Sequence, residues 1–388
     1  MVGGRLKRRC NFESIKDVQV FITSYGMLRE DSEYYKELSF RSMIIDEAQN
    51  IKNHSTDITK TVKMIKADTK FGLTGTPIEN SIQELWSIFD FIMPGFLPDL
   101  SNFDKKYRIK DFDDDSNKKL KDLNSIISPF ILRRRKRDVI KDLPEKIENN
   151  IYIEMSTEQK KLYLVELERV NKEVDRIISE GSNSKISFLI LQLLTHLRQI
   201  CIDPKIIYPD YNSTSGKMDE FVHTVEVSIK NNHKILVFTS FREALRLAKK
   251  RLDSINITSY VIDGSVSSKK RMELVDKFNE DDTNVFFIML KAGGTGLNLT
   301  SADIVIHLDL WWNPQAENQA TDRAHRIGQT KVVEVIKFIT KGTIEEKILD
   351  LQNKKKILSD KLIDEGGEIE FNKLTEEDIR NLLSYNEK

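Results

Sequence analysis

Two adjacent carboxylates, Asp46 and Glu47, stand directly after the apolar run at residues 43–45 and are followed by Ala48 and Gln49. In a parallel α/β sheet, functional groups lie just beyond the carboxyl ends of the strands. Phosphoryl chemistry needs such a pair, because one carboxylate can hold the water shell of Mg²⁺ and the other can orient and deprotonate an attacking water. For an isolated pair a solvated strand end is the better explanation, so the catalytic interpretation depends on the other strings.

Two further strings contain small residues that let the backbone approach a ligand. Residues 73–80, Leu-Thr-Gly-Thr-Pro-Ile-Glu-Asn, combine Gly75 and Thr76 with a proline at the expected start of a helix. Residues 291–300 hold three glycines within four positions, and their bare amide groups could cradle a phosphate. Each string alone also fits an ordinary turn.

Two arginines stand at a helical spacing near the end of the chain. After Pro314 the sequence predicts a helix, in which Gln319, Arg323 and Arg326 at i, i+4 and i+7 share one face. Two guanidinium groups one turn apart form a fork suited to a transferring phosphoryl group, although a salt-bridged surface pair would have the same spacing. His325 lies off this face and is predicted to be a structural hydrogen-bonding residue.

The elements that must position these residues read as alternating strands and helices. Short Val/Ile/Phe runs followed by polar turns and amphipathic stretches are typical of buried parallel strands. The expected strands are 18–23, 42–45, 70–74, 234–238, 258–262, 284–288, 304–308 and 332–339. The fold class is therefore α/β.

Helical patterns fill the remaining regions. Residues 155–200 are predicted to be helical, with a polar break at 181–184, and residues 211–216 read as a linker. A capping box of Thr343 and Glu346 predicts a final helix.

The composition excludes several classes of protein. Charged residues make up 31% and hydrophobic residues 39% of the chain, which is too apolar for global disorder. No apolar stretch approaches the roughly 18 residues of a bilayer span, and residues 1–10 lack the apolar core of a secretory signal. Cys10 and Cys201 are too few and too far apart for a disulfide framework or a Cys-built zinc site. We expect a soluble, cytoplasmic protein without a membrane partner.

The charges balance, with 61 Lys and Arg against 61 Asp and Glu, so the net charge gives no strong indication of a partner. A basic run at 133–137 and an acidic run at 111–115 lie within this balance. The basic run fits contact with an anionic polymer, but a solvated or ion-paired face is the commoner explanation.

Four strings, taken together and in this order, resemble motifs two, three, five and six of the Swi/Snf-type ATPases, the double-stranded-DNA translocases of helicase superfamily two. They are residues 46–49, 73–80, 291–300 and 323–329, the last reading Arg-Ala-His-Arg-Ile-Gly-Gln. Further strings extend the resemblance over nearly the whole chain, at 22–25 (motif Ib), 129–134, 143–146, 197–201, 237–241 (motif IV) and 342–347.

The resemblance implies two RecA-like lobes with parallel sheets, the first incomplete, joined by a helical linker region. The implied divisions are a partial first lobe at 1–150, a helical inter-lobe segment at 151–214, a second lobe at 215–342 and a helical tail at 343–388. ATP and Mg²⁺ would bind between the lobes, and duplex DNA would lie across both.

The resemblance also assigns roles to single residues. Asp46 would hold Mg²⁺ indirectly, Glu47 would activate water, and Arg323 and Arg326 would reach the γ-phosphate. Residues implied in nucleotide binding or coupling are Gln49, Gly75, Thr76, Gly294, Gly296 and Gln319. Residues implied in contacts to the DNA backbone are Tyr25, Lys291, Thr295 and Trp312. Trp312, with Trp311, fits inter-lobe core equally well.

The sequence departs from the family in one large respect, because it contains no G-x-x-x-x-G-K-S/T string. The lysine, the amides and the hydroxyl that would hold the β/γ-phosphates and Mg²⁺ are therefore not in the chain. Three explanations stay open: a truncated fragment of a longer ATPase, half of a split enzyme whose partner chain supplies the P-loop, or a degenerate binding protein. We expect the first lobe to expose apolar surface and the chain alone to hydrolyse ATP negligibly.

The rival functions are an ATP-driven DNA translocase, a duplex-DNA-binding subunit without turnover, and an RNA-polymerase-associated recycling factor. Strand separation is not expected of a member of this family. A Lys- and Ile-rich, Ala-poor composition indicates an AT-rich bacterial genome, which argues against nucleosomes. Together with the DNA binding that the resemblance implies, we expect a nucleoid-associated protein of the bacterial cytoplasm.

Overall fold

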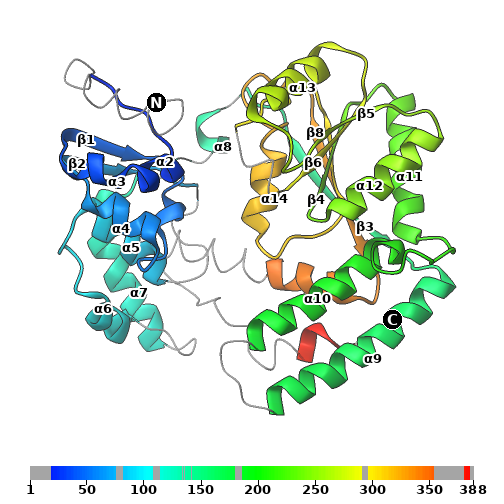
Figure 1. Cartoon of the computed structure of the whole chain (residues 1–388), viewed down its shortest axis with the longest axis horizontal. Helices are drawn as coiled ribbons and strands as arrows, with labels where there is room; N and C mark the ends of the chain where they lie inside the picture. Colours follow the sequence, from blue (N-terminus) through cyan, green and yellow to red (C-terminus); the bar gives the residue numbers. More distant parts are fainter. Residues whose placement is uncertain are drawn as a thin grey trace. The chain divides into compact units, whose positions relative to one another are not determined.

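The computed structural model describes residues 19–75, 82–107, 114–132, 134, 136–140, 142–179, 186–290, 296–353 and 380–384. These residues divide into two compact units, one up to Leu132 and one from residue 134 onward (Figure 1). Both units are built from parallel strands and helices, as the α/β prediction required. No helix of the described ranges is long and apolar enough to cross a membrane.

The first unit is built around two parallel strands, β1 (Ser39–Ile45) and β2 (Lys66–Gly72), joined by η2 (Ala48–Ile51) and α4 (Asp57–Met64). Its other elements are α2 (Tyr25–Glu30), α3 (Ser32–Lys36), α5 (Ile82–Ile92), α6 (Leu100–Tyr107), α7 (Asp114–Ile127) and η3 (Ser128–Phe130). The strands expected at 42–45 and 70–74 are confirmed, although β2 begins earlier. The strand expected at 18–23 is wrong for its described part, because residues 19–24 form no ladder.

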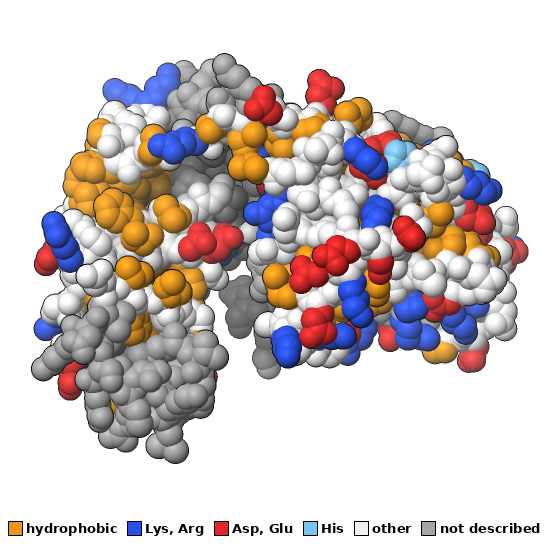
Figure 2. Space-filling model, turned by 90° about the horizontal axis from the view of Figure 1, so that it is seen from above, with side chains coloured by type: hydrophobic (Ala, Val, Ile, Leu, Met, Phe, Trp, Pro, Cys, Tyr) orange, Lys and Arg blue, Asp and Glu red, His pale blue; other side chains and the backbone are white. Residues whose placement is uncertain are grey.

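One face of this sheet is packed and the other is not. A core that includes Ile45, Val62 and Phe91 fills the space against the helices. On the opposite face Ile44 and Phe71, which are partners in the ladder, are 63% and 54% exposed. Figure 2 shows hydrophobic side chains gathered over this unit. Parallel sheets are normally covered on both faces, so the exposed face fits the expectation of an incomplete first lobe.

The second unit contains a six-stranded, all-parallel sheet in the order β3-β8-β7-β4-β6-β5. The strands are β3 (Lys146–Ile153), β4 (Ile235–Thr239), β5 (Ser259–Ile262), β6 (Val285–Met289), β7 (Ile304–His307) and β8 (Val333–Thr340). All except β3 correspond to predicted strands. The sequence led us to place residues up to 150 in the first lobe, whereas β3 pairs with β8 along its whole length.

The second unit also contains helices. They are α8 (Lys136–Val139), α9 (Thr157–Ser179), α10 (Ile186–Ile202), η4 (Pro204–Ile206), α11 (Gly216–Lys230), α12 (Arg242–Ser254), α13 (Ser268–Glu280) and α14 (Pro314–Thr321). The helical prediction for 155–200 is confirmed, while its break at 181–184 lies outside the described residues. The linker at 211–216 ends where Ser215 caps α11. A Cβ at Gly216 would lie 2.1 Å from the carbonyl oxygen of Glu154, so only glycine fits there.

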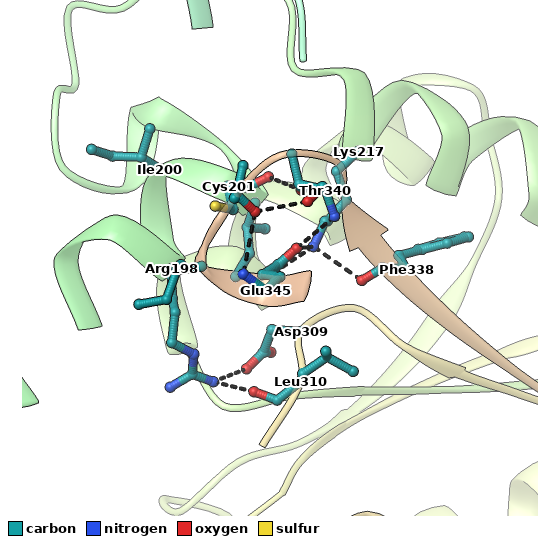
Figure 3. Close-up of polar contacts among 12 residues, drawn as sticks. Arg198, Ile200, Cys201, Lys217, Asp309, Leu310, Phe338, Thr340 and Glu345 are labelled. Atoms are coloured by element: carbon teal, nitrogen blue, oxygen red, sulfur yellow. Dashed lines mark hydrogen bonds and ion pairs between the residues drawn. The ribbon is translucent and has the colours of Figure 1, made fainter. Parts of the chain in front are cut away.

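The final helix, 344–353, begins as the capping box predicts. The Thr343 hydroxyl accepts a hydrogen bond from the Glu345 amide at 3.2 Å, and the Glu346 carboxylate accepts from the Gly342 amide at 3.1 Å. A fully buried ion pair then ties this helix to α11, because the Lys217 ammonium donates to the Glu345 carboxylate at 2.6 Å and to the Phe338 carbonyl at 3.2 Å (Figure 3).

A buried imidazole in the central strand β7 makes the second unit sensitive to acid. His307 is fully buried, stacks on Phe238 and contacts the Thr321 hydroxyl. Burial lowers the pKa of His307 from 6.5 to about 4. Between these two pH values the imidazole is protonated in the unfolded chain but stays neutral in the folded chain. Stability should therefore fall by about 3 kcal/mol between pH 7 and pH 4 from this group.

Urea unfolding at a series of pH values tests this expectation. His307→Gln should flatten the pH dependence over that window, whereas the exposed control His223→Gln should retain it. An unchanged slope in His307→Gln would contradict the assignment.

Candidate active-site residues

The acid pair lies at the carboxyl end of β1, as predicted. One Asp46 carboxylate oxygen accepts a hydrogen bond from the Glu47 amide at 2.9 Å. The backbone before and after the acid pair is hydrogen-bonded to Leu73. The Leu73 amide donates to the Ile45 carbonyl, and the Ala48 amide donates to the Leu73 carbonyl, both at 2.8 Å. Glu47 itself adopts a left-handed conformation, with φ +50°. Non-glycine residues held this way are strained and are concentrated at functional sites.

A hydrogen-bonded chain of side chains connects this pair with the string at 73–80. The Gln49 amide group donates to a Glu47 carboxylate oxygen at 2.6 Å, and its carbonyl oxygen accepts from the Thr74 hydroxyl at 2.7 Å. The two strings therefore meet at one strand edge, and Gln49 fixes the orientation of the Glu47 carboxylate. Gly75 follows directly, with open space where a Cβ would stand. Thr76 lies outside the described residues.

Tyr25 lies against the acid pair. Its hydroxyl donates to the Asp46 carbonyl oxygen at 2.7 Å, and Ser24 caps α2 just before it. Burial, with the Asp46 and Glu47 charges as smaller contributions, raises the pKa of Tyr25 to about 12. The phenol therefore stays protonated and continues to donate at physiological pH. This contact connects the motif Ib string to the carboxylates.

The prediction that one helical face presents Gln319, Arg323 and Arg326 is wrong. Helix α14 ends at Thr321, and residues 322–328 continue as successive turns, so only Gln319 lies on the helix. The reason is tertiary hydrogen bonding. The Arg323 carbonyl accepts from the Leu299 amide at 3.1 Å, which commits it to a partner outside the helix. Gly328 then turns the chain with φ +102°.

These turns, residues 322–328, are called the arginine turn below. They lie against the glycine-rich loop formed by the string at 291–300, because an Arg326 guanidinium nitrogen donates to the Leu297 carbonyl at 3.3 Å. Gln329 donates to the carbonyls of Ala302 and Ala324, at 2.8 and 3.2 Å, and closes the turn. Gly296 begins the described part of the loop with φ +24°. Lys291, Gly294 and Thr295 lie outside the described residues.

Comparisons with known protein families match two domains, one that contains the acid pair and one that contains the arginine turn. Residues 4–206 match the SNF2-related domain, and residues 216–328 match the helicase conserved C-terminal domain. The chain belongs to the SNF2 family.

SNF2-family relatives cover almost all of the chain. An uncharacterized ATP-dependent helicase of Mycoplasma genitalium is 39% identical over 382 residues, which is 98% of this chain and 36% of the relative. YwqA of Bacillus subtilis, named as an ATP-dependent helicase/translocase, is 38% identical over 90% of this chain and 38% of its own length. The chain thus spans little more than a third of these two curated relatives.

The fold is also that of a solved SNF2-family structure. The SWI2/SNF2 ATPase core of Sulfolobus solfataricus in complex with double-stranded DNA superposes with a TM-score of 0.53 and 37% identity, covering 95% of this chain and 78% of that one. The assignment to two RecA-like lobes therefore stands.

Trp312, one of the four residues expected at DNA, packs against the apolar core between α9, α10 and the final helix. The Arg198 guanidinium lies 5.5 Å from its ring centre. Arg198 also donates to the Asp309 carboxylate at 3.0 Å and to the Leu310 carbonyl (Figure 3). These contacts favour the alternative in which the tryptophan belongs to a core, here one within the second unit.

Sequence reasoning missed Glu317, whose carboxylate is almost fully buried. It accepts from the Trp311 amide at 2.6 Å and from the Gln352 side chain at 2.8 Å, and it pairs with Lys337 at 2.9 Å. This network ties α14 to the final helix and so supports the arginine turn. A glutamate in the first turn of a helix is usually solvated, so no local signal distinguished it.

The residues present fit a nucleotide-bound Mg²⁺. Such a magnesium needs only one or two carboxylates, together with waters and phosphates. Asp46 is exposed at the strand end and uses one oxygen for the Glu47 amide. Within the described ranges no three His, Cys, Asp or Glu side chains converge as a metal cluster.

Proposed function

We propose that this chain carries the hydrolytic acid pair, the arginine turn and part of the DNA-binding surface of an ATP-driven motor. The motor would move along duplex DNA without separating the strands. The observation that carries the proposal is the Glu47–Gln49–Thr74 chain, which orients one carboxylate beside another at a strand end. Membership of the SNF2 family and the likeness to a core solved with double-stranded DNA support it.

Each group would act through its own chemistry. A bound Mg²⁺ would neutralise charge on the nucleotide phosphates. Asp46 would hold a water of that ion, and Glu47 would orient the attacking water and accept its proton. Arg323 and Arg326 would stabilise charge on the γ-phosphoryl group, with Gln49, Gly75, Thr76, Gly294, Gly296 and Gln319 binding the nucleotide or coupling its state to the lobes.

The DNA contacts remain proposals as well. Lys291 and Thr295 would contact the phosphate backbone, which positions the motor without reading sequence. Tyr25, whose hydroxyl is bonded to the Asp46 carbonyl, would connect a DNA contact at motif Ib with the acid pair. We retain the divisions at 214 and 342 in the proposed domain plan and move the end of the first lobe from 150 to Leu132, because β3 pairs with β8 in the second unit. The bacterial cytoplasm with its nucleoid is the proposed location.

A polypeptide segment that carries a P-loop would complete the first lobe, whether as part of a longer chain or as a partner chain. Two observations support this: the sequence contains no G-x-x-x-x-G-K-S/T string, and the face of the β1–β2 sheet at Ile44 and Phe71 is exposed. The missing segment would supply the phosphate-binding amides, the lysine and a hydroxyl ligand to Mg²⁺.

Steady-state ATP hydrolysis, measured with and without duplex DNA, tests the proposal. The chain alone should show negligible turnover. A form that includes the P-loop, found by searching the coding sequence upstream of Met1 or a neighbouring reading frame, should show DNA-stimulated turnover and displace a third strand from a triplex. Salt-dependent duplex binding without turnover in the P-loop form would favour the DNA-binding subunit instead, and co-purification with RNA polymerase would favour the recycling factor.

A further inference from the structure

The arginine turn has a second attachment besides its contact with the glycine-rich loop. The Lys136 ammonium group on α8 donates to the Asp322 carboxylate at 2.6 Å and to the His325 carbonyl at 2.7 Å. Asp322 directly precedes Arg323, and His325 directly precedes Arg326. The Lys136 side chain therefore holds the turn at two points, one before Arg323 and one after it.

A second hydrogen bond joins the arginine turn to the residues that follow α8. The His325 imidazole donates from Nε2 to the Pro144 carbonyl at 2.8 Å, and the next residue, Glu145, accepts from the Val333 amide at 3.0 Å. We call α8 together with residues 142–145 the α8 strap. The strap thus contacts the arginine turn at Asp322 and at His325.

The two ends of the strap differ in how firmly they are held. Its end at Pro144 leads into β3, which is bonded to β8 over the whole of Lys146–Ile153. Its beginning, at Lys136, follows Leu132, the last residue of the main segment of the first unit, after only three residues. Among the described residues, Lys136 is the first after the first unit to contact the arginine turn, so a force transmitted along the chain from that unit reaches this contact first.

The attachment at Lys136 is also the weaker one. The Lys136 and Asp322 side chains are 39% and 46% exposed, and exposed ion pairs of this kind contribute little and are screened by salt. Such a contact can open and close during a reaction cycle, whereas the β3–β8 ladder cannot.

We propose that Lys136 is a positioning residue for Arg323 and Arg326, and that the α8 strap transmits movement of the first unit to the arginine turn. The proposal rests on the proposed function, because it assigns a control to the same catalytic groups. In this role Lys136 acts through the arginine turn and not through a contact with the nucleotide.

Hydrogen–deuterium exchange of this chain tests the contact directly. The amides of residues 323–326 donate to the carbonyls of Ala320, Thr321 and Ala324, so their exchange reports opening of the turn together with the end of α14. Lys136→Met should speed their exchange by roughly tenfold, with β8 unchanged, and about 1 M salt should bring the unmodified chain toward the same rate. The matched control is Lys341→Met, which removes an ion pair to Glu154 of similar exposure in the same unit. Equal protection in Lys136→Met and in the control would overturn the proposal.

Kinetics of the P-loop form test the positioning role. Lys136→Met should lower kcat for DNA-stimulated ATP hydrolysis about tenfold with KM for ATP unchanged, and Lys136→Arg, which can reach both acceptors, should restore most of it. Faster exchange with an unchanged kcat would reject the positioning role. If no form hydrolyses ATP while Lys136→Met still loosens the turn, the proposed function fails and the strap contact stands.

Discussion

Arg326→Ala should lower the DNA-stimulated ATP hydrolysis rate of the P-loop form by about 10³-fold or more. A guanidinium group that meets the γ-phosphoryl group stabilises charge that develops mainly in the transition state, so kcat should fall far more than the affinity for ATP. The structure adds a positional reason. Arg326 lies in a turn, not on a helix, and the bonds of that turn to Leu299 and Ala302 come from Arg323 and Gln329, so they do not depend on the Arg326 side chain.

Single-turnover and steady-state assays with ATP would measure the effect. Arg326→Lys keeps the positive charge but loses the planar fork, and it should recover only a small part of the rate. Arg246→Ala on α12 is the matched control, because this arginine is exposed and pairs with Glu243 three residues away. Duplex binding should remain in all three variants. A loss of rate below tenfold in Arg326→Ala would remove this residue from the catalytic groups.

The strands that could be predicted from the sequence were those with continuous apolar runs. The strands β4, β6 and β7 are buried along nearly their whole length, and their Val, Ile and Phe runs reflect burial on both faces. By contrast, β3 reads Lys-Ile-Glu-Asn-Asn-Ile-Tyr-Ile and is mostly exposed at the edge of the sheet. Only its pairing with β8, nearly two hundred residues later in the chain, makes it a strand, and such a partner leaves no local pattern.

The candidate site could also be predicted from the sequence only in part. Asp46, Glu47 and Gln49 could be placed because a strand end puts consecutive side chains at one edge, and Gln49 does reach Glu47. The arginine turn could not be placed, because helix propensity after Pro314 continues past the point where the helix ends. What ends it is a set of bonds from Leu299 and Lys136, residues of distant segments. Local periodicity carries no information about such partners.

Glu47→Gln is expected to lower kcat of the P-loop form by about 10²- to 10⁴-fold while leaving the binding of ATP and duplex DNA nearly intact. The substitution removes the acceptor for the proton of the attacking water but keeps the size of the side chain. A glutamine oxygen can still accept the hydrogen bond that Gln49 donates at 2.6 Å, so the Glu47–Gln49–Thr74 chain should persist.

The strained backbone at Glu47 makes a folding control necessary, because any substitution there retains a φ of +50°. Thermal unfolding of Glu47→Gln should match the unmodified protein within a few degrees. Glu33→Gln, an exposed glutamate of the same unit that pairs with Lys36, should leave both stability and kcat unchanged. A Glu47→Gln variant that folds normally and hydrolyses ATP at more than a tenth of the original rate would assign the base to another group. Asp46 would then be the remaining carboxylate at this strand end, and the division of labour between the two acids would have to be reversed.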